Sequence, residues 1–180
     1  SLKNINKFPS IFVANEFFDA LPIKQFEYKD NKWFEKYIIN KGKSFEFFEK
    51  KIEKKLIEKL IKLAIPKNQK FIEYSPLANK KLIMISKIIK KNNGALLMID
   101  YGYNNKKMIN SLQSVKKHKK NNLFENIYNA DITHLINFNF FMEKLTNLKI
   151  DCVKLTTQRE FLLKMGILQR AEIISKNMPF

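Results

Sequence analysis

Cysteine, glycine and arginine are all scarce in this chain of 180 residues. Its single cysteine, Cys152, excludes a disulfide framework or a cysteine-based zinc site within the chain and fits a reducing compartment. The four glycines, Gly42, Gly94, Gly102 and Gly166, do not have the spacing of a glycine-rich nucleotide-binding loop. The sequence contains neither an apolar run of membrane-spanning length nor a signal-peptide pattern.

The charge balance is strongly basic, and it rests on lysine. The net charge is +17, and residues 41–120 hold 21 lysines against 6 acidic residues. Arg159 and Arg170 are the only arginines, although recognition of base edges and phosphates favours arginine. Nucleic-acid binding is therefore disfavoured, and a solvated lysine surface is expected. His118 and His134 lack metal-ligand spacing, so we expect no metal site.

Two unbroken apolar runs, at residues 11–14 and 95–99, end abruptly in polar residues. Such runs predict strands buried on both faces, as in a parallel sheet covered by helices, and we expect the two to be adjacent and parallel. Ligands of open α/β sheets bind beyond the carboxyl ends of the strands, which is where Asn15, Glu16 and Asp19 lie. The alternative is that these residues only cap a loop or a helix.

The segment between the two runs predicts a hairpin and a helix. Alternation over residues 23–48 indicates a β-hairpin with a turn at Asp30-Asn31, and residues 44–48 as a third strand. For the helix, Ser75 is the expected N-cap and residues 92–94 the stop. The helix should begin at Pro76 and bury one apolar stripe, formed by Leu77, Leu82, Ile85, Ile88 and Ile89.

A basic amphipathic helix is also expected, because apolar residues recur every four positions with lysines on the other face. Packing onto the sheet is the favoured interpretation of this helix. Contact with an anionic membrane or an acidic partner is the alternative. Its apolar positions are Phe48, Ile52, Leu56, Leu60 and Ala64.

Five blocks of sequence carry a family resemblance. They are NEFFDALP at 15–22, IDYG at 99–102, SLQSVKKH at 111–118, DITH at 131–134 and TQREFLLKMGI at 157–167. In this order they resemble the MidA family of class I S-adenosylmethionine-dependent methyltransferases, which includes a mitochondrial arginine methyltransferase needed for respiratory complex I assembly. The family's glycine-rich donor loop lies upstream of everything that matches here, and its usual Gly-Glu pair is replaced by Tyr128-Asn129.

The resemblance implies the carboxyl-terminal part of a Rossmann-like α/β methyltransferase sheet, with residues 23–48 as a β-hairpin insertion. All 180 residues would form one partial domain that lacks the glycine-rich part. The resemblance also implies that S-adenosylmethionine is the cofactor. The implied reaction is protein arginine methylation, with a protein substrate such as a complex I subunit. The compartment would be the cytoplasm of a bacterium or the mitochondrion of a eukaryote. The alternative is a non-catalytic interaction or assembly module without donor binding.

Residues that follow the two strands take roles from this resemblance. Glu16 and Asp19 are expected to be catalytic, because paired carboxylates can clamp a cationic guanidinium through charge-assisted hydrogen bonds. Asn15 is expected to orient the donor or the acceptor. Phe17 and Tyr101 are expected to wall the substrate site and exclude water. Loop capping or side-chain packing is the alternative role for these residues.

Overall fold

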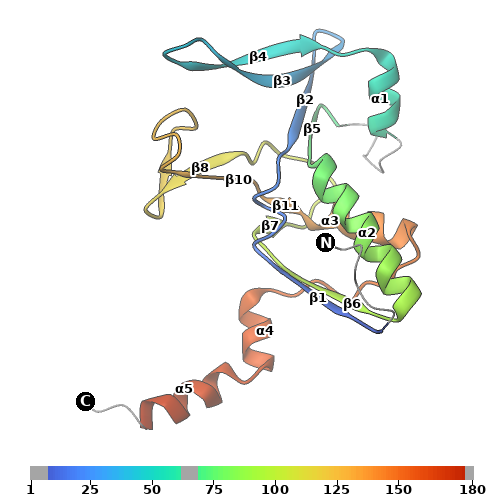
Figure 1. Ribbon diagram of the computed structural model, residues 1–180, viewed down its shortest axis with the longest axis vertical. Coiled ribbons are helices and arrows are strands. Elements are labelled where there is room, and N and C mark those ends of the chain that lie inside the picture. Colours follow the sequence, from blue (N-terminus) through green and yellow to red (C-terminus); the bar gives the residue numbers. More distant parts are fainter. Residues whose placement is uncertain (1–7, 62–68, 177–180) are drawn as a thin grey trace.

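A computed structural model of the chain describes residues 8–61 and 69–176. It is a mixed α/β fold in which the strands form several small sheets rather than one continuous sheet. Figure 1 shows the arrangement of the elements. In chain order these are β1 (Ile11–Asn15), β2 (Lys24–Lys29), β3 (Lys32–Asn40), β4 (Phe45–Lys51), α1 (Lys54–Ile61), β5 (Phe71–Tyr74), α2 (Pro76–Asn92), β6 (Ala95–Ile99), β7 (Gly102–Tyr103), β8 (Gln113–Lys116), β9 (Lys119–Asn121), β10 (Asp131–Thr133), β11 (Ile136–Asn137), α3 (Phe138–Asn147), α4 (Gln158–Lys164) and α5 (Ile167–Lys176).

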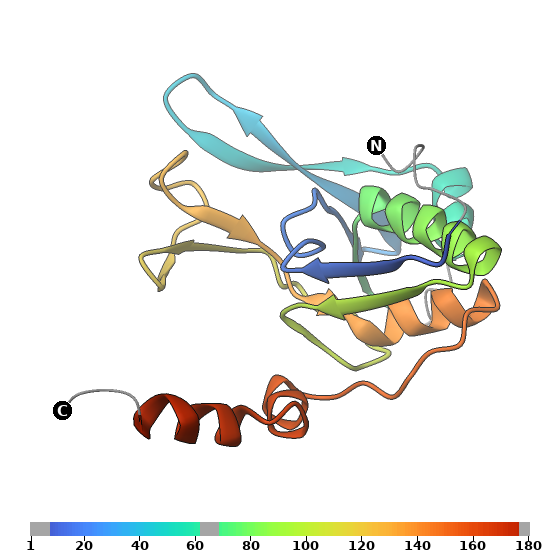
Figure 2. The ribbon, with the colours of Figure 1, turned by 60° about the horizontal axis from the view of Figure 1, so that its bottom comes forward.

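Strands β1 and β6 are adjacent and parallel, which confirms the prediction from their apolar runs. The register runs from Ile11 opposite Ala95 to Asn15 opposite Ile99, so both strands end at the same edge. Helix α2 lies along this pair of strands (Figures 1 and 2). The loops that carry the predicted site residues therefore begin side by side.

The expectation that these strands are buried on both faces is wrong. Ile11 and Val13 are 77% and 64% exposed, and Leu97 of β6 is also exposed. Successive side chains of a strand point to opposite faces, so the other face carries Ala14, which packs in the core with Leu82 of α2. Within the described residues, the apolar run of β1 is therefore buried on one face of the strand and exposed on the other.

Helix α2 has the predicted ends. The Ser75 hydroxyl accepts a hydrogen bond from the Ala78 amide at 3.0 Å, and Pro76 is the first helical residue. Asn93 ends the helix in the left-handed conformation, with φ of 52°. Of the expected apolar stripe, Leu82 and Ile85 are buried, whereas Leu77 is exposed.

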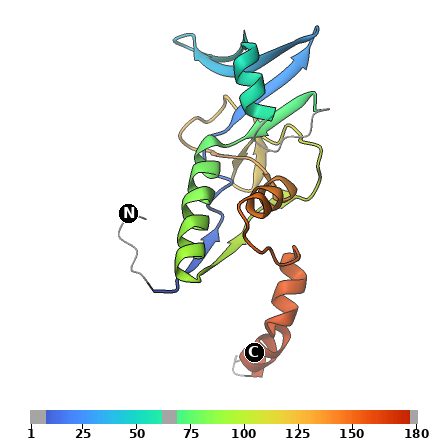
Figure 3. The ribbon, with the colours of Figure 1, turned by 90° about the vertical axis from the view of Figure 1, so that its right-hand side faces the viewer.

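Residues 24–51, together with β5, form an antiparallel sheet whose strand order is β4-β3-β2-β5. Strands β2 and β3 pair across the predicted turn at Asp30 and Asn31, whose φ values of 50° and 57° match a tight hairpin turn. Strand β4 is the third strand that the alternation predicts, and it pairs with β3. The sheet projects at one end of the molecule (Figure 3).

The basic amphipathic helix is shorter than predicted. Phe48 lies in β4, opposite Tyr37 of β3, and helix α1 begins only at Lys54. The reason is that residues 45–51 gain a complete ladder of hydrogen bonds with β3, which outweighs their four-residue apolar spacing. Leu60 is buried as expected, and Ala64 lies outside the described residues.

The core lies between α2, the antiparallel sheet and α3. Its fully buried side chains include Phe18, Phe26, Leu82 and Ile136, and the Phe18 ring meets Phe141 of α3 edge to face at 5.4 Å. Helices α4 and α5 extend away from this core and have no buried residue (Figures 2 and 3). Among the described residues, no helix has the length and apolar character that crossing a membrane requires.

Candidate active site

The predicted site residues lie where β1 and β6 end together. The amide of Glu16 donates to the carbonyl oxygen of Ile99 at 2.9 Å, which extends the parallel ladder by one residue. Glu16 then has a φ of 45°, a left-handed conformation that turns the chain sharply out of the strand. Asn15 is exposed at the last position of β1.

Asp100, the first residue after β6, joins the two loops. One of its carboxylate oxygens accepts the amide hydrogens of Phe18 at 3.1 Å and Asp19 at 3.3 Å. The other oxygen accepts the amide of Tyr101 at 2.9 Å. Three backbone donors thus fix this carboxylate, and through it the loop after β1 is held against the loop after β6.

Asp19 is the most deeply placed acidic residue of the site, with only 6% of its surface exposed. Its Oδ1 atom has no hydrogen-bond partner within the described residues. A buried carboxylate oxygen without a partner is costly, because the desolvation of the charge is not compensated. Burial, together with the negative charge of Asp19, raises the pKa of Asp100 to about 6.

Glu16 and Tyr101 form the outer part of the site. Tyr101 is 61% exposed. The charge of Glu16 and a hydrogen bond with it raise the pKa of the Tyr101 hydroxyl, and the charges of Asp19 and Asp100 act in the same direction. Three carboxylates therefore act on one phenol group, which brings the predicted catalytic residues Glu16 and Asp19 into one neighbourhood with the predicted substrate residue Tyr101.

The two phenylalanines of the loop have different surroundings. Phe18 is fully buried and anchors the loop in the core, whereas Phe17 is 41% exposed. Their rings meet edge to face at 5.1 Å. Phe17 therefore lies at the surface, and its role as a wall of the substrate site stays a prediction.

Sequence reasoning did not select three residues that shape the site: Asp100, His134 and Glu73. His134 is buried, its amide donates to the Asp19 carbonyl oxygen at 3.2 Å, and burial lowers its pKa against the opposing charges of Glu73 and Asp19. Asp100 follows a predicted strand directly, and that position is the signal that could have identified it. His134 and Glu73 approach the site only through tertiary contacts.

Glu73 is connected to the segment that contains His134 through hydrogen bonds. Its carboxylate accepts hydrogen bonds from the Gln25 side chain at 2.6 Å and from both the amide and the hydroxyl of Ser111. The Ser111 hydroxyl in turn accepts the amide of Leu135 at 2.9 Å. A buried polar network therefore links the antiparallel sheet to the loop that contacts Asp19.

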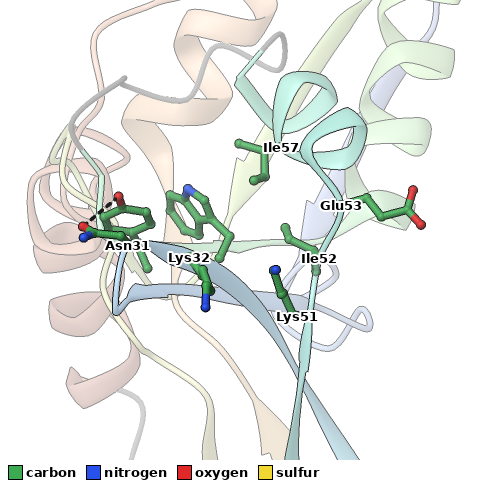
Figure 4. A pocket seen from close by; sticks show the side chains of 8 residues that line it. Asn31, Lys32, Lys51, Ile52, Glu53 and Ile57 are labelled. Atoms are coloured by element: carbon green, nitrogen blue, oxygen red, sulfur yellow. Dashed lines mark hydrogen bonds between the residues drawn. The ribbon is translucent and has the colours of Figure 1, made fainter.

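A pocket of about 460 Å³ opens beside Asp100. Its walls come from the end of β6, from Tyr103 and Phe138, and from the segment that leads into α4. A larger pocket of about 720 Å³ lies between the β2–β3 turn and α1, and includes Asn31, Lys32 and Ile57 (Figure 4). Neither pocket is lined by a predicted site residue, and the smaller one adjoins the site only through Asp100.

Comparison with known proteins places the chain in a family. Residues 1–156 match a family described as "putative S-adenosyl-L-methionine-dependent methyltransferase". The mitochondrial protein arginine methyltransferase NDUFAF7 homolog of Caenorhabditis elegans is 31% identical over 174 residues, which are 93% of this chain and 41% of that protein. The zebrafish (Danio rerio) mitochondrial NDUFAF7 is 29% identical over 187 residues, which are 99% of this chain and 42% of that protein.

A solved structure from Burkholderia thailandensis, described as a "likely methyl transferase" bound to S-adenosyl-homocysteine, has the same fold. The TM-score is 0.69 at 20% identity, over 90% of this chain and 43% of that protein. A second structure from that organism gives a TM-score of 0.71 at 20% identity, over 92% of this chain and 46% of that one. The chain thus spans about two fifths of the length of the relatives it matches. With its family match over residues 1–156, the chain belongs to this family of S-adenosylmethionine-dependent methyltransferases.

Proposed function

We propose that this chain forms the methyl-acceptor side of a protein arginine methyltransferase that uses S-adenosylmethionine. The observation that supports this most strongly is that three acidic residues follow β1 and β6 where the two strands end together, with the Asp100 carboxylate accepting the amides of Phe18 and Asp19. These residues are Glu16, Asp19 and Asp100, and they form an acidic site in a chain whose net charge is +17. Such a site attracts a cationic side chain.

The finer architecture belongs to the same proposal. The parallel pair β1–β6, with α2 between the strands in sequence, is what part of a Rossmann-like sheet would contain. Residues 23–48 would then be a β-hairpin insertion after its first strand. The 180 residues would form one partial domain without the glycine-rich donor loop. The likeness to solved structures of which this chain covers less than half supports that view.

The acceptor would be bound by its positive charge. An arginine side chain carries five N–H donors in a planar fork, which can pair with more than one carboxylate at once. The unpartnered Oδ1 of Asp19 offers a buried acceptor for one of these donors, and Glu16 offers an exposed one. Phe17 and Tyr101 would then flank the guanidinium and limit the access of water.

Methylation of a guanidinium nitrogen also requires the removal of a proton. A bond forms between nitrogen and the methyl carbon while the bond from that carbon to sulfur breaks, and the nitrogen loses its proton. With a pKa of about 6, the Asp100 carboxyl exchanges protons near neutral pH. Asp100 is therefore suited to receive this proton.

The chain's residues fit the reacting part of the donor. S-adenosylmethionine supplies the methyl group as a sulfonium, whose positive charge suits a site lined by carboxylates. Asn15, exposed at the end of β1, would orient the donor or the acceptor. The four glycines provide no glycine-rich cradle for the rest of the donor, so we expect other residues of the enzyme to hold it.

The substrate would be a protein, and a respiratory complex I subunit is the partner that we propose. The names of the relatives support a protein arginine acceptor and a mitochondrial location for those proteins. In a eukaryotic source this chain would share that location, and in a bacterial source it would act in the cytoplasm. Both compartments are compatible with its single free cysteine, Cys152.

The experiment that tests this function follows the methyl group. An enzyme of the relatives' length that contains this chain is incubated with methyl-labelled S-adenosylmethionine and cell-extract protein. The proposal predicts label in methylarginine after hydrolysis of the protein. Label on lysine or glutamine, or no protein-bound label at all, would contradict the proposal and favour a non-catalytic assembly module.

A further inference from the structure

Two hairpins project from the same side of the molecule. They are β3–β4, connected by residues 41–44, and β8–β9, which turns at Lys117 and His118 (Figures 1 and 2). The rings of Phe47 in β4 and Phe124 in the loop after β9 meet at 5.0 Å. This contact joins the β3–β4 hairpin to the loop after β9 on the surface from which both hairpins project.

This surface is rich in exposed lysine, and we refer to its five exposed lysines as the basic tip. No ion pair in the described part of the chain includes any of them. Glu46 and Glu125 are the nearest acidic residues in sequence, so the positive charge is only partly compensated. The lysines of the basic tip are Lys41, Lys43, Lys117, Lys119 and Lys120.

Apolar side chains accompany this charge. In the β3–β4 hairpin, Tyr37 is paired with Phe48 and Ile38 with Phe47, and successive pairs point to opposite faces. All four side chains are between 40% and 51% exposed, so both faces of the hairpin end are apolar. Tyr128, in the loop after β9, is 98% exposed. Packing within the described part of the chain does not account for the exposure of these apolar side chains.

We propose that the basic tip and its aromatic neighbours dock on an anionic phospholipid surface. Clusters of four to eight lysines bind anionic headgroups, and exposed aromatic rings settle at the level of the headgroups. The absence of arginine from the tip disfavours a nucleic acid, whose recognition favours arginine. A projecting tip can reach a flat membrane surface. A single-stranded nucleic acid, in contrast, is typically bound along a positively charged groove.

Docking would be local to the hairpins. The lysines of the basic tip are attracted to an anionic surface, whereas carboxylates are repelled by it. This docking does not depend on the proposed methyl transfer, and it can be tested without any enzymatic assay.

The test is co-sedimentation of the 180-residue chain with lipid vesicles. Phosphatidylcholine vesicles with about 30% phosphatidylserine, at about 0.1 M salt, should bind the chain, and phosphatidylcholine alone should not. The combined change Lys117→Gln, Lys119→Gln and Lys120→Gln should weaken binding about a hundredfold, since each lysine contributes about fivefold. Phe48→Ser should weaken it further, whereas Val153→Ser, at another exposed apolar position, should not.

A matched triple variant controls for net charge. Lys80, Lys87 and Lys91 are exposed on α2, and their combined change to Gln removes the same charge from another surface. Binding by this variant should stay within about threefold of the parent, since distant charges are screened. Equal loss in both triple variants overturns the proposal, because net charge alone would then explain binding. Tighter, tip-dependent binding to a single-stranded oligonucleotide than to the vesicles would also overturn it and identify a nucleic-acid surface.

Discussion

The backbone amide of Asp19 donates a hydrogen bond to the carboxylate of Asp100 at 3.3 Å, so two acidic residues 81 positions apart share one corner of the fold. The contact exists because β1 and β6 are parallel and end in register. It places a second carboxyl group beside a carboxylate that is already partly buried. The charge of Asp19 then raises the pKa of Asp100, and this effect can be measured.

The first prediction concerns the pKa of Asp100. Burial is the main cause of its rise to about 6, and the charge of Asp19 is the second. Asp19→Asn should therefore lower the pKa of Asp100 toward its ordinary value. Carbon-13 NMR titration of the Asp100 carboxyl group measures its titration midpoint in the parent and in the variant. Asp131→Asn, at an exposed carboxylate of β10, should leave the midpoint unchanged, and an unchanged midpoint in Asp19→Asn as well would disprove the coupling.

The same group makes stability depend on pH. Because the pKa rises from 3.8 to about 6 on folding, the native state binds the proton more tightly than the unfolded state. This contribution is complete below the unfolded value and is lost as pH rises through about 6. A change of this size corresponds to about 3 kcal/mol, which partial exposure reduces to about 1 to 2 kcal/mol.

Urea unfolding measures this contribution. The free energy of unfolding of the parent should fall between about pH 4.5 and pH 7 relative to that of Asp100→Asn, which cannot titrate there. The comparison of slopes matters, since loss of hydrogen bonds can lower the stability of the variant at every pH. Parallel pH profiles for the two proteins would show that Asp100 does not titrate in this range.

The Glu73 network should be important for stability. Glu73→Ala leaves the Gln25 side chain and the Ser111 amide without their buried acceptor, which should cost about 2 to 4 kcal/mol in the free energy of unfolding. Glu46→Ala removes an exposed glutamate from β4 and should cost less than about 0.5 kcal/mol. Urea midpoints provide the comparison. Equal effects of the two changes would mean that the network contributes nothing specific.

Donor binding by the isolated chain should be weak. The glycines, at positions 42, 94, 102 and 166, are too far apart to form a loop that cradles the donor's nucleoside and amino-acid parts. Isothermal titration calorimetry of the 180 residues with S-adenosylmethionine should show no saturable heat in the micromolar range. A micromolar dissociation constant would mean that the chain contains a donor site of another kind.

Local signals in the sequence predicted the elements that depend on local structure. Ser75 and Pro76 begin a helix because a side-chain cap and a fixed φ act within one turn. Asp30 and Asn31 form the predicted turn because both tolerate positive φ. The pairing of β1 with β6 also followed from the sequence, since unbroken apolar runs favour parallel strands.

Features that depend on distant partners could not be predicted from the sequence. Phe48 has helical apolar spacing, yet β3 offers it a cross-strand partner in Tyr37. For the site, position after a strand predicted Asn15, Glu16 and Asp19, and the roles of these residues stay predictions. The contribution of His134 requires a contact with Asp19 that no spacing in the sequence reveals.

The central claim is that Glu16 and Asp19 hold the cationic acceptor during methyl transfer. Glu16→Gln and Asp19→Asn, in an enzyme of the relatives' length, should each slow methyl transfer by about two to three powers of ten. Neither change should lower the melting temperature by more than a few degrees. Asp19→Asn removes a charge that repels Asp100, so it has no electrostatic reason to destabilise the fold.

The most direct test measures methyl transfer to protein arginine and melting temperature on the same samples, with Asp131→Asn as the exposed-carboxylate control. The account predicts a large loss of turnover with nearly unchanged melting for Glu16→Gln and Asp19→Asn, and normal values for the control. Near-normal turnover with a lowered melting temperature would contradict it and show that the two carboxylates only cap the loop after β1.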